Sequence, residues 1–345
     1  GLLSAKGDVA GLISTRQPLE TIYAFNNLLA DKVKASLITS TEEGAATSTS
    51  AAFAESLGKP FETKISDLET SNGVLILGVD LVKDHQVAGF FIKRNLQSGT
   101  NLVVIDTKEN GLDKQANKTI KPAAGTFEDV LKAISAAVVK LGLAKGKTSL
   151  KASDLDALAT ATNVKSEDYL DAAFILASAV DPVIVYGQRA NLVLLREFAS
   201  LIGGKLISVK GEANSLVASQ LGLDTPYKPA NYKAAFVALG DGDLSQKMAQ
   251  ELEKIPFKVV QASYASALTA NADVVFPATT WLEQSGHYLS ADGRLLEAKK
   301  SLEPAEEILP IETTLNKLAE KMGVKLDHDF HKAIHHRVAP VELNS

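Results

Sequence analysis

Short unbroken apolar runs recur along the chain, separated by stretches in which apolar residues return every three or four positions. The runs predict strands buried on both faces, and the longer spacing predicts amphipathic helices. The expected strands are 36–40, 74–78, 101–106, 183–187, 206–209, 235–240, 259–262 and 273–276. The expected helices are 18–33, 87–96, 127–139, 153–161, 166–180, 192–202, 244–253 and 311–322. This alternation predicts mostly parallel sheets covered by helices on both faces.

One late stretch combines a strand with a hairpin signal. Residues 273–276 form an apolar run that ends at a proline, which cannot donate a ladder hydrogen bond. Further on, Asp292-Gly293 separates residues 287–289 from 294–296, and this dipeptide favours a tight turn with positive φ. The pattern predicts a buried strand, a turn and a hairpin. From the residues alone, an ordinary loop after a strand explains it at least as well.

Composition bounds the size and class of the protein. The chain has 345 residues, enough for two domains of ordinary size, with 46% apolar and 22% charged residues. The net charge of −5 argues against a general nucleic-acid binder. No apolar run reaches the ~18 residues that a membrane span needs. No signal-peptide pattern follows Gly1, and the chain begins without methionine.

The chain contains no cysteine. It therefore has no disulfide and no thiolate with which to bind an iron–sulfur cluster or a metal ion. This agrees with a reducing cytoplasm, where we expect the protein to reside.

Residues 74–106 have the pattern of a nucleotide-binding βαβ unit. Gly78 ends the first strand, where the backbone of a glycine can approach a phosphate group. Asp106 ends the second strand, where its carboxylate can accept hydrogen bonds from a ribose or a guanine. The alternative, which the residues alone favour, is that Asp106 caps the turn that follows it.

The late stretch resembles the molybdopterin oxidoreductase superfamily, in which a strand reading Ala-Asp-Val-Val-Leu-Pro precedes Glu, Gly, Glu-Gly-Arg, a basic run and Glu-Pro-Pro. The closest likeness is to the carboxyl-terminal part of the large G-type subunit of NADH:quinone oxidoreductase (complex I). Asp292 and Ala305 depart from the pattern. The matching residues are 272–277, Glu283, Gly286, Gly293, Arg294, Lys299, Lys300, Glu303 and Pro304.

The resemblance implies a pterin cofactor site, but this chain departs from it. Gly125 and Thr126 match the family's Pro-Gly-Thr-Asp motif, whereas Phe127 replaces the Asp that helps to bind guanine. Residues 42–45 (Glu-Glu-Gly-Ala) stand where relatives supply a cysteine or selenocysteine ligand to the metal. We therefore expect at most a vestigial cofactor site. Its residues would be Gly78, Asp106, Gly125, Thr126 and Arg294.

Histidines near the end of the chain are weak candidates for metal ligands. On a helix, His331 and His335 would lie one turn apart on one face, with His328 nearby, a spacing that can bind zinc or nickel. A solvated tail on an amphipathic helix is the favoured alternative, because spacing alone is a weak signal. We expect no metal ion in this chain.

The resemblance implies two doubly wound α/β domains, one inserted in the other, as in formate dehydrogenase and DMSO reductase. Residues 1–35 and 181–330 would form the first domain, residues 36–180 the inserted one, and residues 331–345 a tail. The family's iron–sulfur module and its terminal β-barrel have no counterpart in this sequence.

We therefore expect a redox-inert structural subunit of a complex I-type NADH dehydrogenase, or of a related formate dehydrogenase or hydrogenase assembly. The chain itself would bind no cofactor, and iron–sulfur clusters and FMN would lie on partner subunits. Those partners would hold it peripherally at the inner membrane. Two alternatives remain open. One is a molybdenum or tungsten formate dehydrogenase core without cysteine, and the other is a metal-free module that binds pterin or a guanine nucleotide.

Overall fold

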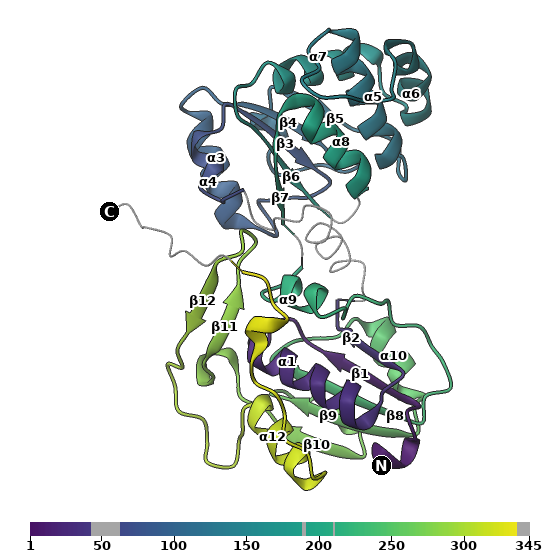
Figure 1. Ribbon diagram of the computed structural model, residues 1–345, viewed down its shortest axis with the longest axis vertical. Helices are drawn as coiled ribbons and strands as arrows, with labels where there is room; N and C mark the ends of the chain where they lie inside the picture. The colour runs from purple at the N-terminus through teal and green to yellow at the C-terminus, as the bar shows by residue number, and fades with distance from the viewer. Residues whose placement is uncertain (43–62, 188–190, 210, 337–345) are drawn as a thin grey trace. The chain divides into compact units, whose positions relative to one another are not determined.

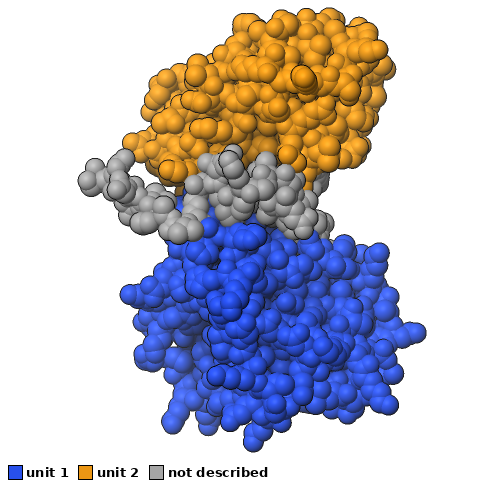
Figure 2. All heavy atoms as spheres, viewed as in Figure 1, with its two compact units in different colours: residues 1–60, 211–345 blue, residues 61–210 orange. Residues whose placement is uncertain are grey.

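A computed structural model describes residues 1–42, 63–187, 191–209 and 211–336. The chain divides into two compact units, which are described separately below (Figures 1 and 2). Unit 1 comprises Gly1–Pro60 and Gly211–Ser345, and unit 2 comprises Phe61–Lys210. Unit 2 is thus a continuous segment inserted in unit 1. None of the helices in the described ranges combines the length and the apolar character that a membrane crossing requires.

Unit 1 contains a five-stranded parallel sheet in the order β10-β9-β8-β1-β2 and a separate antiparallel hairpin, β11-β12. Its strands are β1 (Val9–Ile13), β2 (Leu37–Ser40), β8 (Ala234–Gly240), β9 (Phe257–Ala262), β10 (Val274–Pro277), β11 (Gly286–Leu289) and β12 (Leu295–Ala298). Its helices are η1 (Leu3–Ala5), α1 (Leu19–Asn27), η2 (Leu28–Val33), α9 (Ser215–Gln220), α10 (Gln246–Glu253), α11 (Ala267–Ala270), η5 (Trp281–Glu283), α12 (Ile311–Lys321) and η6 (Phe330–Lys332).

The two faces of this sheet bury different helices. Because side chains alternate along a strand, Leu12 of β1 and Val237 of β8 share one face, where they form a core with Met248 and Leu252 of α10. On the other face, Phe236 contacts Phe25 of α1, with ring centroids 5.4 Å apart. Helices therefore cover both faces of the parallel sheet, as expected for central strands such as β1 and β8 that are buried along their whole length.

Unit 2 contains a second five-stranded parallel sheet, in the order β5-β4-β3-β6-β7. Its strands are β3 (Gly73–Leu77), β4 (Asn101–Ile105), β5 (Lys118–Ile120), β6 (Pro182–Tyr186) and β7 (Lys205–Ser208). Its helices are α3 (Asp67–Thr70), α4 (Gln86–Leu96), η3 (Asp113–Gln115), α5 (Phe127–Lys140), η4 (Ala152–Asp154), α6 (Leu155–Thr162), α7 (Ser166–Ala177) and α8 (Leu192–Ile202). Figure 1 shows α3 and α4 on one face of this sheet and α5, α7 and α8 on the other.

The predicted fold class is confirmed: both units are α/β with mostly parallel five-stranded sheets. The expected domain boundaries need correction, however. β2 pairs with β1 and so belongs to unit 1, whereas β6 pairs with β3 and β7 with β6, so both belong to unit 2. The boundary expected at residue 181 falls directly before β6, whose first residue is Pro182, a strand position that tolerates proline.

The hairpin also differs in detail from the expectation. Its loop is five residues long, between Leu289 and Leu295, rather than the two-residue Asp292-Gly293 turn. Of these two residues only Gly293 has a positive φ, of 81°. Register follows from the pairing of Leu289 with Leu295, which places Tyr288 opposite Leu296.

Candidate functional site

The carboxyl ends of β3, β4 and β6 form the place where a sheet of this topology binds ligands. The chain leaves β3 for β4 on one side, and β6 lies on its other side, so the strand order reverses at β3. Gly78 follows β3 with φ 66° and donates its N–H to the carbonyl of Ile105, 2.9 Å away. Asp106 follows β4 and is 8% exposed. The structure thus brings these two predicted residues to one edge of unit 2.

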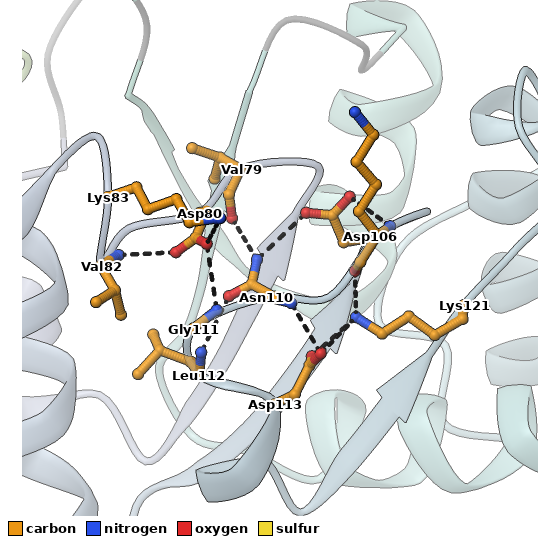
Figure 3. Close-up of polar contacts among 11 residues, drawn as sticks. Val79, Asp80, Val82, Lys83, Asp106, Asn110, Gly111, Leu112, Asp113 and Lys121 are labelled. Atoms are coloured by element: carbon orange, nitrogen blue, oxygen red, sulfur yellow. Dashed lines mark hydrogen bonds and ion pairs between the residues drawn. The ribbon is translucent and has the colours of Figure 1, made fainter.

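The carboxylate of Asp106 is bound by its own loop (Figure 3). Its Oδ1 accepts from the Lys108 N–H at 3.3 Å, and its Oδ2 accepts from Nδ2 of Asn110 at 3.3 Å. The same Nδ2 donates to the carbonyl oxygen of Val79 at 2.7 Å, which ties the loop after β4 to the loop after β3. This is the turn-capping arrangement that the residues alone favoured.

Two further carboxylates on this edge are also engaged within the protein (Figure 3). Asp80 accepts from the N–H groups of Val82 at 3.0 Å and Gly111 at 3.3 Å. Asp113 accepts from the N–H of Asn110 at 2.8 Å and from Nζ of Lys121 at 2.9 Å. The polar groups drawn here therefore bond mainly to one another.

The ring of Phe127 covers the end of β3. A methyl group placed on Gly78 would lie 3.1 Å from Cε1 and 3.2 Å from Cζ of this ring, which is only 5% exposed. On the other side, a methyl group on Gly187 would lie 2.7 Å from the carbonyl oxygen of Gly78. The ring of Phe127 and the backbone at Gly187 therefore both pack closely against Gly78.

The remaining residues of the motif lie at the start of α5. Gly125 has φ 84°, and a methyl group on it would meet nothing within 4 Å, so its backbone angle rather than lack of space favours glycine. Thr126 donates its hydroxyl to the carbonyl of Ala123 at 2.8 Å. The hydroxyl of Thr126, like the carboxylate of Asp106, is therefore bonded within its own loop.

Arg294 belongs to unit 1 and pairs within its own loop. Its Nε lies 3.0 Å from Oδ1 of Asp292, whose side chain is 4% exposed, whereas Arg294 itself is 30% exposed. Ser290 also donates its hydroxyl to Asp292 and accepts the N–H of Arg294 at 3.0 Å. The guanidinium group of Arg294 therefore bonds within the loop between β11 and β12.

The candidate histidines do not lie together on one face of a helix. The described segment makes a 3₁₀ turn at Phe330–Lys332, and Nδ1 of His331 lies 3.2 Å from Nε2 of His336. The backbone of His335 bonds to Gln220, and His328 lies 3.5 Å from a carboxylate oxygen of Glu312. In the described part of the chain, no three or more His, Cys, Asp or Glu are grouped to hold a metal ion.

A second polar edge, in unit 1, was missed by the sequence reasoning. There the strand order reverses between β1 and β8, and these strands are followed by Arg16 and Asp241, whose nearest side-chain atoms are 3.7 Å apart. Nearby, the fully buried Asn214 joins three segments of unit 1. The signal that could have found it is Arg16, a cation that the amphipathic pattern of residues 18–33 does not explain.

Two similar solved structures share the fold of this chain. Acetylene hydratase from Pelobacter acetylenicus superposes with a TM-score of 0.70 at 14% identity, covering 94% of this chain and 56% of that one. A chain of the formyltransferase/hydrolase complex from Methylorubrum extorquens superposes with a TM-score of 0.63 at 14% identity, covering 92% of this chain and 94% of that one. Identities this low support the fold alone.

Sequence relatives fall into two groups. The alpha subunit of F420-dependent formate dehydrogenase 2 from Methanococcus maripaludis is 22% identical over 78% of this chain and 50% of its own length. The mitochondrial 78 kDa subunit of NADH-ubiquinone oxidoreductase from Candida albicans is 26% identical over 45% of this chain and 23% of its own length. The chain thus spans about half the length of the formate dehydrogenase subunits it matches. The match to the NADH dehydrogenase subunits covers less of this chain, so the expected closeness to complex I is supported only in part.

The family profile described as "Molybdopterin oxidoreductase" matches residues 2–321, which include nearly all of both units. The sheet order and the motif residues agree with this match. The chain belongs to the molybdopterin oxidoreductase family.

Proposed function

We propose that this chain is a redox-inert structural part of a multi-subunit oxidoreductase of the formate dehydrogenase or NADH dehydrogenase type. The observation that carries the proposal is the ring of Phe127, which lies against Gly78 at the ligand-binding edge of unit 2. Phe127 stands where the family motif has an aspartate, so this edge lacks that hydrogen-bond acceptor. The ring of Phe127 also fills space beside Gly78.

Two further observations support this role. No cysteine exists in the sequence to bind a metal or an iron–sulfur cluster, so FMN and the clusters would lie on partner subunits. The residues that replace the family's metal ligand include Glu42, whose carboxylate accepts three hydrogen bonds within unit 1, whereas residues 43–45 lie outside the described ranges. Several of the relatives it matches are themselves named as subunits.

Titration calorimetry with GDP tests whether the edge of unit 2 retains a guanine site. We expect no saturable heat with the wild-type protein, because Phe127 offers guanine no acceptor and Asp106 is already bonded within its loop. Tight GDP binding that Asp106→Ala abolishes would overturn the proposal. The exposed Asp84, replaced by alanine, is the matched control for the loss of one carboxylate in unit 2.

A second candidate function is the core of a molybdenum or tungsten formate dehydrogenase. It is favoured by the formate dehydrogenase alpha subunits, which match more of this chain than the NADH dehydrogenase subunits do. In this alternative, a carboxylate or hydroxyl would replace the missing thiolate as the metal ligand, against the preference of these metals for soft sulfur ligands. The metal content of the purified protein separates the two candidates.

A further inference from the structure

Two buried acceptors at the carboxyl edge of unit 1 have no donor. Oε1 of Gln17 and Oδ1 of Asp241 make no hydrogen bond within the described residues, although the Gln17 side chain is 0% and the Asp241 side chain 5% exposed. Leaving a buried acceptor unbonded costs roughly 1–3 kcal/mol, so such atoms in a native protein call for a missing partner. A ligand that donates hydrogen bonds would supply it.

The two acceptors belong to one place in unit 1. Nε2 of Gln17 donates to the carbonyl oxygen of Leu239 at 3.2 Å, and a methyl group on Gly240 would lie 2.1 Å from the same nitrogen. Gly240 directly precedes Asp241, so the amide of Gln17 lies against the end of β8. This is the point where the strand order of the sheet reverses, the usual position of a ligand in an open parallel sheet.

The charge around this point is predominantly negative. Arg16 lies 3.7 Å from Asp241, beyond good hydrogen-bond distance, and its side chain is 43% exposed. Partial desolvation raises the pKa of Glu212; Arg16 lowers it, while Glu42, Asp241 and Asp243 raise it further. Among the described residues, the charged groups that act on Glu212 are one guanidinium and three carboxylates, so with Glu212 itself the negative charges outnumber the positive ones and favour a bound cation.

The carboxylates are not arranged to bind a metal ion. Both oxygens of Glu42 are occupied, by the hydroxyl of Thr15 at 2.6 Å, the N–H of Glu212 at 2.6 Å and the hydroxyl of Ser215 at 2.7 Å. The described residues contain no cluster of three or more potential metal ligands, here or elsewhere. The edge therefore suits an organic cation that carries several N–H donors.

We propose that the edge between β1 and β8 binds the guanidinium group of an arginine from a partner chain. A guanidinium is planar, stays charged and presents five N–H donors, so it can serve Gln17 Oε1 and Asp241 Oδ1 together while lowering the negative potential. The proposal rests on the assembly role proposed above, because it assigns the cation to a partner. Both acceptors belong to unit 1, whereas the edge that Phe127 closes belongs to unit 2.

The test is calorimetric titration of the full chain with a capped Gly-Arg-Gly peptide, and with the uncharged Gly-citrulline-Gly peptide for comparison. We expect the arginine peptide to bind saturably and more tightly at low salt, and the citrulline peptide not to bind. Asp241→Asn should weaken binding about tenfold or more, the usual loss for a hydrogen bond to a charged group. Arg16→Gln should instead strengthen binding several-fold by removing a like charge.

Control variants keep the outcomes distinct. Glu306→Gln removes one negative charge at an exposed position of unit 1 and should leave the affinity unchanged. If Asp241→Asn fails to fold, the change in peptide affinity caused by Arg16→Gln still shows whether the site prefers a cation. Pyrophosphate that binds the wild type and is lost in Arg16→Gln would overturn the proposal, as would equal binding of the two peptides. Metal content does not enter this test, so the inference can fail while the proposed function stands.

Discussion

Phe127→Ala is expected to lower the free energy of unfolding of unit 2 by about 3–5 kcal/mol, the usual cost of removing a buried phenylalanine ring. The ring is 5% exposed and lies at the start of α5 against the backbone of Gly78, so its loss opens a cavity between that helix and the end of β3. Urea unfolding of the variant and the wild type measures this decrease in the free energy of unfolding. Hydrogen exchange of peptides from β3 and β4 shows that the loss falls in unit 2.

Phe174→Ala is the matched control, because it deletes the same ring in unit 2 at a position that is 58% exposed. We expect this variant to change the free energy of unfolding by no more than about 0.5 kcal/mol. Equal effects of the two substitutions would mean that Phe127 does not close the edge as described. GDP binding by folded Phe127→Ala, and not by the wild type, would show that the ring itself excludes nucleotide.

Asn214→Ala is expected to destabilise unit 1 by roughly 3 kcal/mol, because it leaves several buried backbone groups unsatisfied. The side chain is 0% exposed. Its Nδ2 donates to the carbonyls of Gln17 at 2.9 Å and His287 at 3.1 Å, and its Oδ1 accepts the N–H of Leu289 at 2.8 Å. One amide therefore joins the segment after β1 to strand β11.

Thermal unfolding and hydrogen exchange check this second prediction. The amide of Leu289 should lose protection in Asn214→Ala, because its acceptor is removed. Asn231→Ala, at an exposed position of the same unit, should have little effect on either measurement. A stable Asn214→Ala variant with β11 still protected would mean that the hairpin is held to unit 1 by other contacts.

The strands that local pattern predicted well are those buried on both faces. β3 and β4 read as unbroken apolar runs, and the structure buries nearly every residue in them. β1 was missed because Val9–Ile13 adjoins a longer helical pattern and contains Gly11, where a methyl group would lie 2.2 Å from Leu29. β5 was missed because a three-residue edge strand, Lys118–Ile120, has too few apolar positions to show a period.

Domain boundaries and site closure depend on pairings between distant residues, which no local pattern contains. Whether β6 joins one sheet or the other depends on its pairing with β3, more than a hundred positions earlier in the chain. The sequence indicated that position 127 has phenylalanine in place of the aspartate of the family motif. The contact between the Phe127 ring and Gly78, however, depends on how α5 packs on the sheet. Likewise, the buried acceptors Gln17 and Asp241 lie in segments that meet only in the folded sheet.

The central claim is that this chain holds no pterin cofactor of its own. The most direct test is to purify it from cells supplied with molybdate and tungstate. Molybdenum and tungsten are measured by mass spectrometry, and the pterin is measured by its fluorescent oxidation product after denaturation. A formate dehydrogenase produced in the same cells is the positive control. The account predicts far less than one metal atom and one pterin per chain; about one of each per chain would contradict it.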